Sequence, residues 1–199
     1  MNNVGLFLFD DIELLDFAGP YEVFSVTSEL SDYTLFRVFS VSEDGEEIRT
    51  VNGLKVQPDF AFDNHPPIDI LIIPGGVGTK KEMDRSAIVE WIRWNNDRAK
   101  MTVSVCSGAR ILARMGLLDG MEVTTHHEVL DEIRRIAPSV TLNPEARFVD
   151  NGRILTAGGI SAGIDVALHI VRKLHGDQIA DRTARYMEYG DWQALPEEK

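Results

Sequence analysis

The chain contains a single cysteine, Cys106, and its neighbours predict that a strand gives way to a helix at this thiol. Residues 102–105 are short and largely β-branched, as in a buried strand, and apolar residues at helical spacing follow over 111–118. Ser104 and Gly108 supply the small neighbours that a tight strand-to-helix turn requires. The first amides of that helix would favour the thiolate and lower a pKa that is about 8.5 in free cysteine. Cys106 is therefore a candidate nucleophile, and the alternative is a small buried hydrophobic residue.

Two further strand ends carry groups that could serve a thiol. Asp16 precedes the first expected helix, where it would either cap that helix, for about 1 kcal/mol, or hold and move a proton beside the sulfur. Gly75 and Gly76 follow the apolar strand 69–74. They either permit a tight turn or let backbone amides approach a developing negative charge. With the amide of Ser107, one of them would complete an oxyanion hole.

Three other positions have a structural and a functional interpretation. His126 ends a short strand and would be either a hydrogen-bonded structural group or the base of a Cys-His pair. Asp165 lies one turn into a helix that Gly158-Gly159 opens, where a carboxylate suits the helix dipole or supports the site. Ser107 and Thr124 offer hydroxyl groups, although both are also ordinary turn or strand residues.

Apolar runs and helical periodicity alternate along the chain. Pro20 is expected only in a first helical turn, which places the start of the first helix near Gly19. The pair Asn52-Gly53 predicts a hairpin with a two-residue primed turn, lying off the main sheet. The expected strands are 4–9, 34–42, 69–74, 102–105, 122–125, 140–142, 147–149 and 153–156, and the later helices are 86–99, 127–137, 161–174 and 177–189. This order predicts an α/β fold with a mostly parallel, doubly wound sheet, whose site lies at the carboxyl ends of the strands.

Composition narrows the function classes. The 199 residues suffice for one domain, 1–199, with a core that needs neither disulfides nor metals. The net charge of −12 opposes contact with nucleic acid. One cysteine excludes an internal disulfide, and the first residues lack the basic and apolar segments of a signal peptide or membrane span. We therefore expect a cytoplasmic protein with a small-molecule substrate and no membrane partner.

Five motifs occur in a fixed order: LDFAGPYEVF at 15–24, IPGG at 73–76, VCSGA at 105–109, TTH at 124–126 and GGISAGID at 158–165. Together they resemble the DJ-1/PfpI superfamily, and the match extends from Val4 to about Tyr189. Within it the chain is most similar to the isonitrile hydratase branch, which carries an LD-x-x-GP-x-E segment. The resemblance implies a flavodoxin-like three-layer sandwich, related to glutamine amidotransferase domains, with a nucleophile elbow. It also implies a homodimer that uses neither a metal nor an organic cofactor.

By the same resemblance, Cys106 is the nucleophile, Asp16 the acid/base partner, and Gly76 an anion-holding group beside the Ser107 amide. Ser107 stands where the branch generally has threonine, so the hydroxyl is kept and a methyl group is lost. The implied reaction is attack of the Cys106 thiolate on the terminal carbon of an isonitrile while protonated Asp16 delivers a proton. Ionised Asp16 then activates water, an N-substituted formamide leaves, and an apolar pocket holds the substituent.

Other branches match the residues less well. PfpI-like proteases carry histidine where Ser107 stands, the DJ-1 branch uses glutamate in place of Asp16, and class I amidotransferases have a late His-x-Glu pair that this chain lacks. Regulators of this superfamily append a helix-turn-helix module, for which we expect no room before Lys199. A second hypothesis is a DJ-1-like oxidative-stress protein, in which Cys106 senses oxidation or scavenges aldehydes as a glyoxalase or deglycase does.

Overall fold

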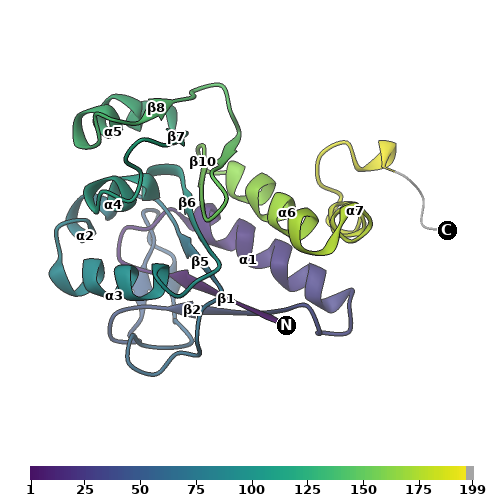
Figure 1. Ribbon diagram of the computed structural model, residues 1–199. Helices are drawn as coiled ribbons and strands as arrows, with labels where there is room; N and C mark the ends of the chain where they lie inside the picture. Colours follow the sequence, from purple (N-terminus) through teal and green to yellow (C-terminus); the bar gives the residue numbers. More distant parts are fainter. Residues whose placement is uncertain (196–199) are drawn as a thin grey trace.

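The apolar runs of the sequence form one central sheet, which lies between two layers of helices (Figure 1). The computed structural model describes residues 1–195, so the domain boundary expected at Lys199 lies outside the described residues. The strand order is β2-β1-β5-β6-β10-β9, and only β9 runs antiparallel to its neighbour. These strands are β1 (Asn2–Phe7), β2 (Phe36–Val41), β5 (Ile70–Ile73), β6 (Met101–Val105), β9 (Phe148–Asp150) and β10 (Ile154–Ala157). The mostly parallel α/β sheet predicted from the sequence is confirmed.

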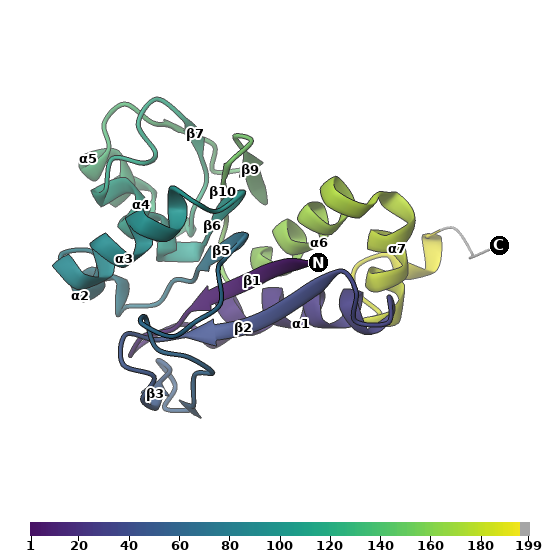
Figure 2. The same ribbon diagram turned by 60° about the horizontal axis from the view of Figure 1, so that its bottom comes forward.

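Helices cover both faces of the sheet, as a parallel sheet with apolar residues on both sides requires. Figures 1 and 2 show α1, α6 and α7 together on one side, and α2 to α5 on the other. The helices are α1 (Leu14–Glu29), α2 (Thr79–Glu82), α3 (Ser86–Asn96), α4 (Ala109–Arg114), α5 (Leu130–Ile136), α6 (Ala162–His175) and α7 (Asp177–Tyr186). This is the three-layer, flavodoxin-like sandwich. Among the helices of residues 1–195, none combines the length and apolar character that a bilayer span demands.

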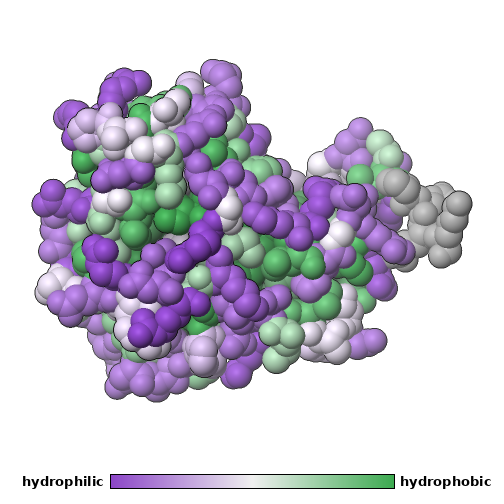
Figure 3. All heavy atoms as spheres, viewed as in Figure 1, coloured by the Kyte–Doolittle hydropathy of each residue, from purple (hydrophilic) through white to green (hydrophobic). Residues whose placement is uncertain are grey.

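The core follows from the sheet. All four residues of β5 and all five of β6 are buried, which is why their sequences are apolar or small throughout. Residues of hydrophilic type dominate the face in Figure 3, with hydrophobic residues showing between them. Because β1, β5, β6 and β10 are parallel, the residues after all four strands meet at one edge of the sheet.

The start of α1 differs from the expectation. The helix begins at Leu14 rather than near Gly19, and Pro20 lies in its interior. Proline has no amide hydrogen to donate to the carbonyl of Asp16 four residues earlier, which normally disfavours this position. Here α1 packs closely on α6: a Cβ added to Gly163 would lie 3.2 Å from the Pro20 ring. Tertiary packing thus outweighs the local preference, and it moves Asp16 from the position before the helix into its first turn.

Two small sheets lie outside the main one. The expected hairpin is present as β3 (Ile48–Arg49) and β4 (Lys55–Val56), off the main sheet as predicted. Its connection is longer than the predicted two-residue turn, since the Thr50 amide donates to the Leu54 carbonyl at 2.9 Å. The expected strand 122–125 is shorter, as β7 (Glu122–Val123), and it pairs with β8 (Thr141–Leu142) outside the main sheet. The turn after β7 returns the chain to the main sheet beside Cys106.

Candidate active site

Cys106 lies at the predicted strand-to-helix junction. It is the first residue of a 3₁₀ turn, Cys106–Gly108, between β6 and α4. Its φ of 54° is in the left-handed region, which is strained for a residue with a side chain and costs about 1–3 kcal/mol. A Cβ on Gly108 would collide with the carbonyl oxygen of Ile73, so the predicted need for a small residue there is met.

Two hydrogen bonds hold the Cys106 backbone in this conformation. Its amide donates to the Gly158 carbonyl at 3.0 Å, and its carbonyl accepts from the Thr125 hydroxyl at 2.6 Å. The sequence singled out Thr124 instead, whose hydroxyl donates to the Ala146 carbonyl at 3.2 Å. Both threonines belong to the same motif, and only the fold shows which of them reaches the cysteine.

Asp16 is completely buried, at 0% exposure, and it does not cap α1. The cap position is Glu13, whose side chain makes no capping bond. One carboxyl oxygen of Asp16, Oδ2, accepts the Gly75 amide at 2.9 Å, while Oδ1 has no hydrogen-bond partner among residues 1–195. Burial raises the pKa of Asp16 from 3.8 to about 7, against the lowering effect of the Gly75 amide. Asp16 can therefore both hold and release a proton near neutral pH.

The thiol is protonated at neutral pH, contrary to the expectation of a lowered pKa. Burial, with Cys106 only 7% exposed, and the nearby charge of Asp16 together raise the pKa of the thiol to about 12. The amides of Ile160 and Ser107 lower the pKa of Cys106, but by less than burial and Asp16 raise it. The thiol and the Asp16 carboxyl lie close enough for each to shift the pKa of the other: Cys106 lowers the pKa of Asp16, and Asp16 raises the pKa of Cys106. A thiol–carboxylate pair, rather than a free thiolate, is the resting state.

The glycine turn after β5 packs directly against the elbow. A Cβ on Gly75 would lie 2.6 Å from the Ser107 amide nitrogen and 2.7 Å from Asp16 Oδ2. Gly76, at φ 122°, has a conformation that side chains rarely adopt. Its amide donates to the Ser107 hydroxyl at 2.9 Å, and that hydroxyl donates back to the Gly76 carbonyl at 3.1 Å. The Gly76 amide is thus already engaged, and the two amides directed at the sulfur are those of Ser107 and Ile160.

Sequence reasoning missed Ile160. It follows Gly158-Gly159 at the end of β10, and its own φ is 42°. Its contribution is a backbone amide, and residue type carries no signal for that. The only available signal was the position of its motif after a buried strand.

His126 lies in the wall of the Cys106 cavity but is engaged elsewhere. Its Nδ1 accepts the Glu128 amide at 3.3 Å, and its ring stands against the His127 ring with 4.3 Å between centroids. Within residues 1–195 no hydrogen bond joins His126 to Cys106. The geometry brings the two into one cavity without the contact of a Cys-His pair.

Asp165 belongs to a separate network. Its Oδ2 accepts from Arg147 Nη2 at 2.5 Å, and its Oδ1 accepts from the Tyr189 hydroxyl at 2.9 Å. It does not line the cavity that contains Cys106. Asp165 therefore has the structural role of a carboxylate in the first turn of α6, not a role in the cavity at Cys106.

The cavity at Cys106 has a volume of about 320 Å³ and a mixed lining rather than the expected apolar one. Arg110 is held in its wall by Glu132 at 2.8 Å and by the Thr79 hydroxyl at 3.1 Å. The lining comprises Glu13, Gly76, Val77, Lys80, Cys106, Ser107, Arg110, His126, Glu128, Val129 and Ile160. Within residues 1–195, no three His, Cys, Asp or Glu side chains are placed to hold a metal ion.

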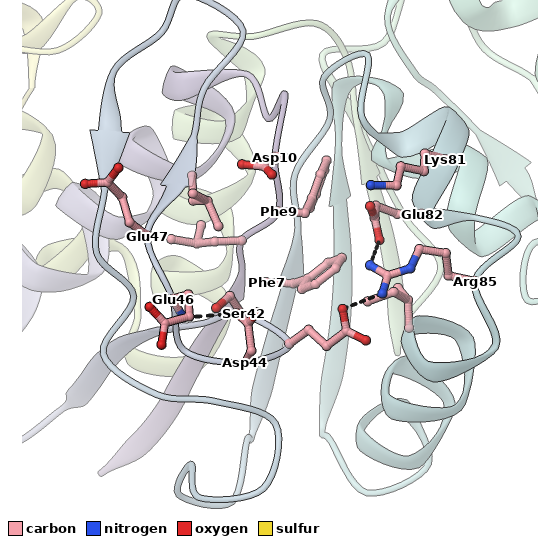
Figure 4. Close-up of a pocket in the computed structure, with 14 residues that line it drawn as sticks. Phe7, Phe9, Asp10, Ser42, Asp44, Glu46, Glu47, Lys81, Glu82 and Arg85 are labelled. Atoms are coloured by element: carbon pink, nitrogen blue, oxygen red, sulfur yellow. Dashed lines mark hydrogen bonds and ion pairs between the residues drawn. The ribbon is translucent and has the colours of Figure 1, made fainter.

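A different cavity, of about 200 Å³, lies between β1, the loop after β2 and the segment around α2 (Figure 4). It is lined by several acidic side chains and by Arg85, which pairs with Glu43 at 2.5 Å and with Glu82 at 3.0 Å. None of the sequence-predicted site residues lines it. The two ion pairs of Arg85 join the loop after β2 to the end of α2.

Fold and site together define an α/β protein with one cysteine on a strained elbow and a buried carboxylic acid beside it. The chain belongs to the DJ-1/PfpI family, whose sequence pattern matches residues 2–173.

Relatives of known type fall into more than one functional class. The chain is 32% identical to an isonitrile hydratase of Pseudomonas putida, covering 94% of this chain and 78% of that protein. It is 30% identical to the HTH-type transcriptional regulator GbdR of Pseudomonas aeruginosa, covering 89% of this chain but only 48% of the regulator. The chain thus spans about half the length of these regulators. The two identities are comparable, although the sequence motifs favoured the hydratase branch.

Solved structures agree on the fold. A THiJ/PfpI family protein from Pseudomonas syringae superposes with a TM-score of 0.85 at 25% identity, covering 99% of this chain and 76% of that one. Drosophila melanogaster DJ-1beta superposes with a TM-score of 0.81 at 16% identity, covering 95% and 98%. The second likeness concerns the fold alone.

Proposed function

We propose that the protein is a cysteine-dependent hydratase that converts an isonitrile and water into an N-substituted formamide. The observation that carries this proposal is the pairing of buried Asp16, whose pKa is about 7, with the Cys106 thiol, which lines the cavity. The similarity to an isonitrile hydratase supports the choice of substrate class.

The first step adds the thiol across the terminal carbon of R–NC. Ionised Asp16 takes the proton of Cys106 as sulfur forms a bond to that carbon, and the proton passes from Asp16 to the same carbon. The product is a thioimidate, R–N=CH–S–Cys106, and Asp16 is again ionised. No free thiolate needs to exist beforehand, which agrees with the raised pKa of the thiol. The amides of Ser107 and Ile160 stabilise the charge that develops on sulfur during transfer.

The second step removes the product with water. Ionised Asp16 takes a proton from water as the water oxygen attacks the thioimidate carbon, and Asp16 passes this proton to the nitrogen. The C–S bond of the tetrahedral adduct then breaks, R–NH–CHO leaves, and the hydroxyl proton returns to the sulfur through Asp16. Atoms balance, because one water molecule is consumed for each formamide.

The proposal is tested by incubating the purified protein with cyclohexyl isocyanide and measuring N-cyclohexylformamide by chromatography. We expect product in catalytic excess over protein. Failure to form product from cyclohexyl isocyanide or from a smaller alkyl isocyanide would overturn it.

A second candidate is the DJ-1-like redox or aldehyde-scavenging protein, favoured by a 24% identity to Protein DJ-1alpha of Drosophila melanogaster over 72% of this chain. Oxidation of cysteine proceeds through the thiolate, and the raised pKa of Cys106 opposes it. Intact-mass spectrometry after mild peroxide, beside turnover of isocyanides and methylglyoxal, separates the two functions. Stoichiometric sulfinate without turnover would favour the sensor.

The proposal also includes the oligomeric state and the cellular location of the protein. The family resemblance supports a homodimer, which light scattering after size-exclusion chromatography tests. A cytoplasmic location would keep the single thiol reduced. Separation of the expressed protein into cytoplasmic and secreted fractions tests this.

A further inference from the structure

A second cavity adjoins the one at Cys106. It also has a volume of about 320 Å³, and it lies between the turn after β7, the loop before β9 and the residues after β10. Its lining comprises Thr125, His126, His127, Pro144, Glu145, Ala146, Arg147, Gly158, Gly159 and Ile160. His126 and Ile160 line both cavities, so these two side chains stand in a shared wall.

We propose that the two cavities form one binding channel, and that His126, together with Ile160, sets the length of the substituent that the site accepts. The first chamber holds the reacting carbon at Cys106, and the second takes the remote end of a long substituent. The substrate class, an isonitrile with an extended R group, rests on the proposed function. The division of the channel rests on the cavity geometry.

The position of His126 is fixed from two sides. Its Nδ1 accepts the Glu128 amide at 3.3 Å, and its ring edge lies so close to Gly159 that a Cβ there would collide with Cδ2. Gly159 thus leaves the space that the imidazole occupies. These contacts hold the ring as a wall rather than as a base aimed at the thiol.

Cavity size supports a channel of two chambers. Pockets for small ligands range over about 300–1,000 Å³, so either chamber alone lies at the lower limit. Joined, they reach the middle of that range. The second chamber also differs in chemistry, since Arg147 and Glu145 give it a polar end that suits an R group ending in a hydrogen-bonding group.

The test uses probes that need no hydratase activity. N-methyl- and N-octyl-iodoacetamide alkylate a thiol with loss of iodide, and Cys106 is the single cysteine of the chain, so intact mass reports one site. The octyl-to-methyl ratio of labelling rates, normalised to that of free cysteine, measures the acceptance of length. For His126→Ala we expect this ratio to rise at least about tenfold, the effect of relieving a poorly accommodated substituent.

Ile160→Gly removes the other shared side chain and relieves its positive φ, so we expect the ratio to rise in this variant as well. Arg134→Ala is the control, because Arg134 is exposed on α5 and lines neither cavity, so its ratio should stay at the wild-type value. If circular dichroism shows that His126→Ala does not fold, the labelling ratio of Ile160→Gly alone tests the inference. Wild-type ratios in every folded wall variant would overturn the inference. Absence of turnover on isocyanides would refute the hydratase proposal and leave these labelling ratios as a separate result.

Discussion

The Gly75 amide donates to Asp16 Oδ2 at 2.9 Å, and this bond joins the turn after β5 to the first turn of α1, 59 residues away in sequence. It fixes one oxygen of a completely buried carboxyl group, whose other oxygen, Oδ1, has no hydrogen-bond partner in the described part of the chain. Burial is the largest cause of the raised pKa, and the nearby charge of Glu13 raises it as well, so Asp16 keeps its proton to about pH 7.

The buried carboxyl of Asp16 should make stability depend on pH. Its pKa is 3.8 ordinarily and about 7 when folded, so the folded state retains a proton that the unfolded chain releases. The stabilisation is fully present below the unfolded pKa and is lost as pH rises through 7, in total about 4 kcal/mol. Asn at position 16 keeps an acceptor for Gly75 and carries no charge. In urea unfolding, the free energy of unfolding of Asp16→Asn should increase relative to that of the wild type between about pH 5 and pH 8. A difference between the two proteins that does not change with pH would contradict the burial argument.

Activity should also depend on the ionisation of Asp16, but it should increase with pH, whereas stability should decrease. The first step needs ionised Asp16, so kcat/KM on an isocyanide should rise with pH through about 7 and then level off. A pH–rate profile of the wild-type protein measures this. A rate that is flat from pH 5.5 to 8.5, or that falls across this range, would exclude Asp16 as the group that accepts the thiol proton.

Gly75→Ala should damage the site through crowding. The added Cβ would lie 2.6–2.7 Å from the Ser107 amide, the Ser107 hydroxyl and Asp16 Oδ2. Overpacking of this kind costs about 1–3 kcal/mol, and displacement of Asp16 should lower kcat. Gly158→Ala is the control, since its Cβ would meet atoms no closer than 3.4 Å. Equal effects of the two changes on thermal stability and turnover would show that crowding at Gly75 is unimportant.

Thr125 should act as a positioning residue for Cys106. Thr125→Val removes the hydroxyl that donates to the Cys106 carbonyl at 2.6 Å, and the loss of this hydrogen bond should cost about 1 kcal/mol. We expect a lower kcat with little change in KM, and recovery in Thr125→Ser, which keeps the hydroxyl. A valine variant with wild-type kcat, or a serine variant as impaired as valine, would argue against this role.

The sequence predicted the layers of the fold because its strands are apolar runs and its helices are periodic. It also predicted the meeting of Asp16, Gly75 and Cys106, because parallel strands end at one edge of the sheet. The predicted start of α1 was wrong, because close packing of Gly163 on Pro20 outweighs the preference of proline for the first turn of a helix.

The prediction of a lowered pKa for Cys106 was also wrong, because it too depended on packing that local sequence does not show. Junction geometry shows that amides face the sulfur but not how deeply the sulfur is buried, and burial outweighs the amides. Ile160 was missed because it contributes a backbone group.

The most direct test of the central claim is the rate of N-cyclohexylformamide formation by wild type, Cys106→Ala and Asp16→Asn, with folding of each variant verified by circular dichroism. We predict turnover by wild type and a loss of at least about 10²-fold in both variants, because one lacks the bond-forming sulfur and the other lacks the proton carrier. Formamide production at the wild-type rate by Cys106→Ala would contradict the account.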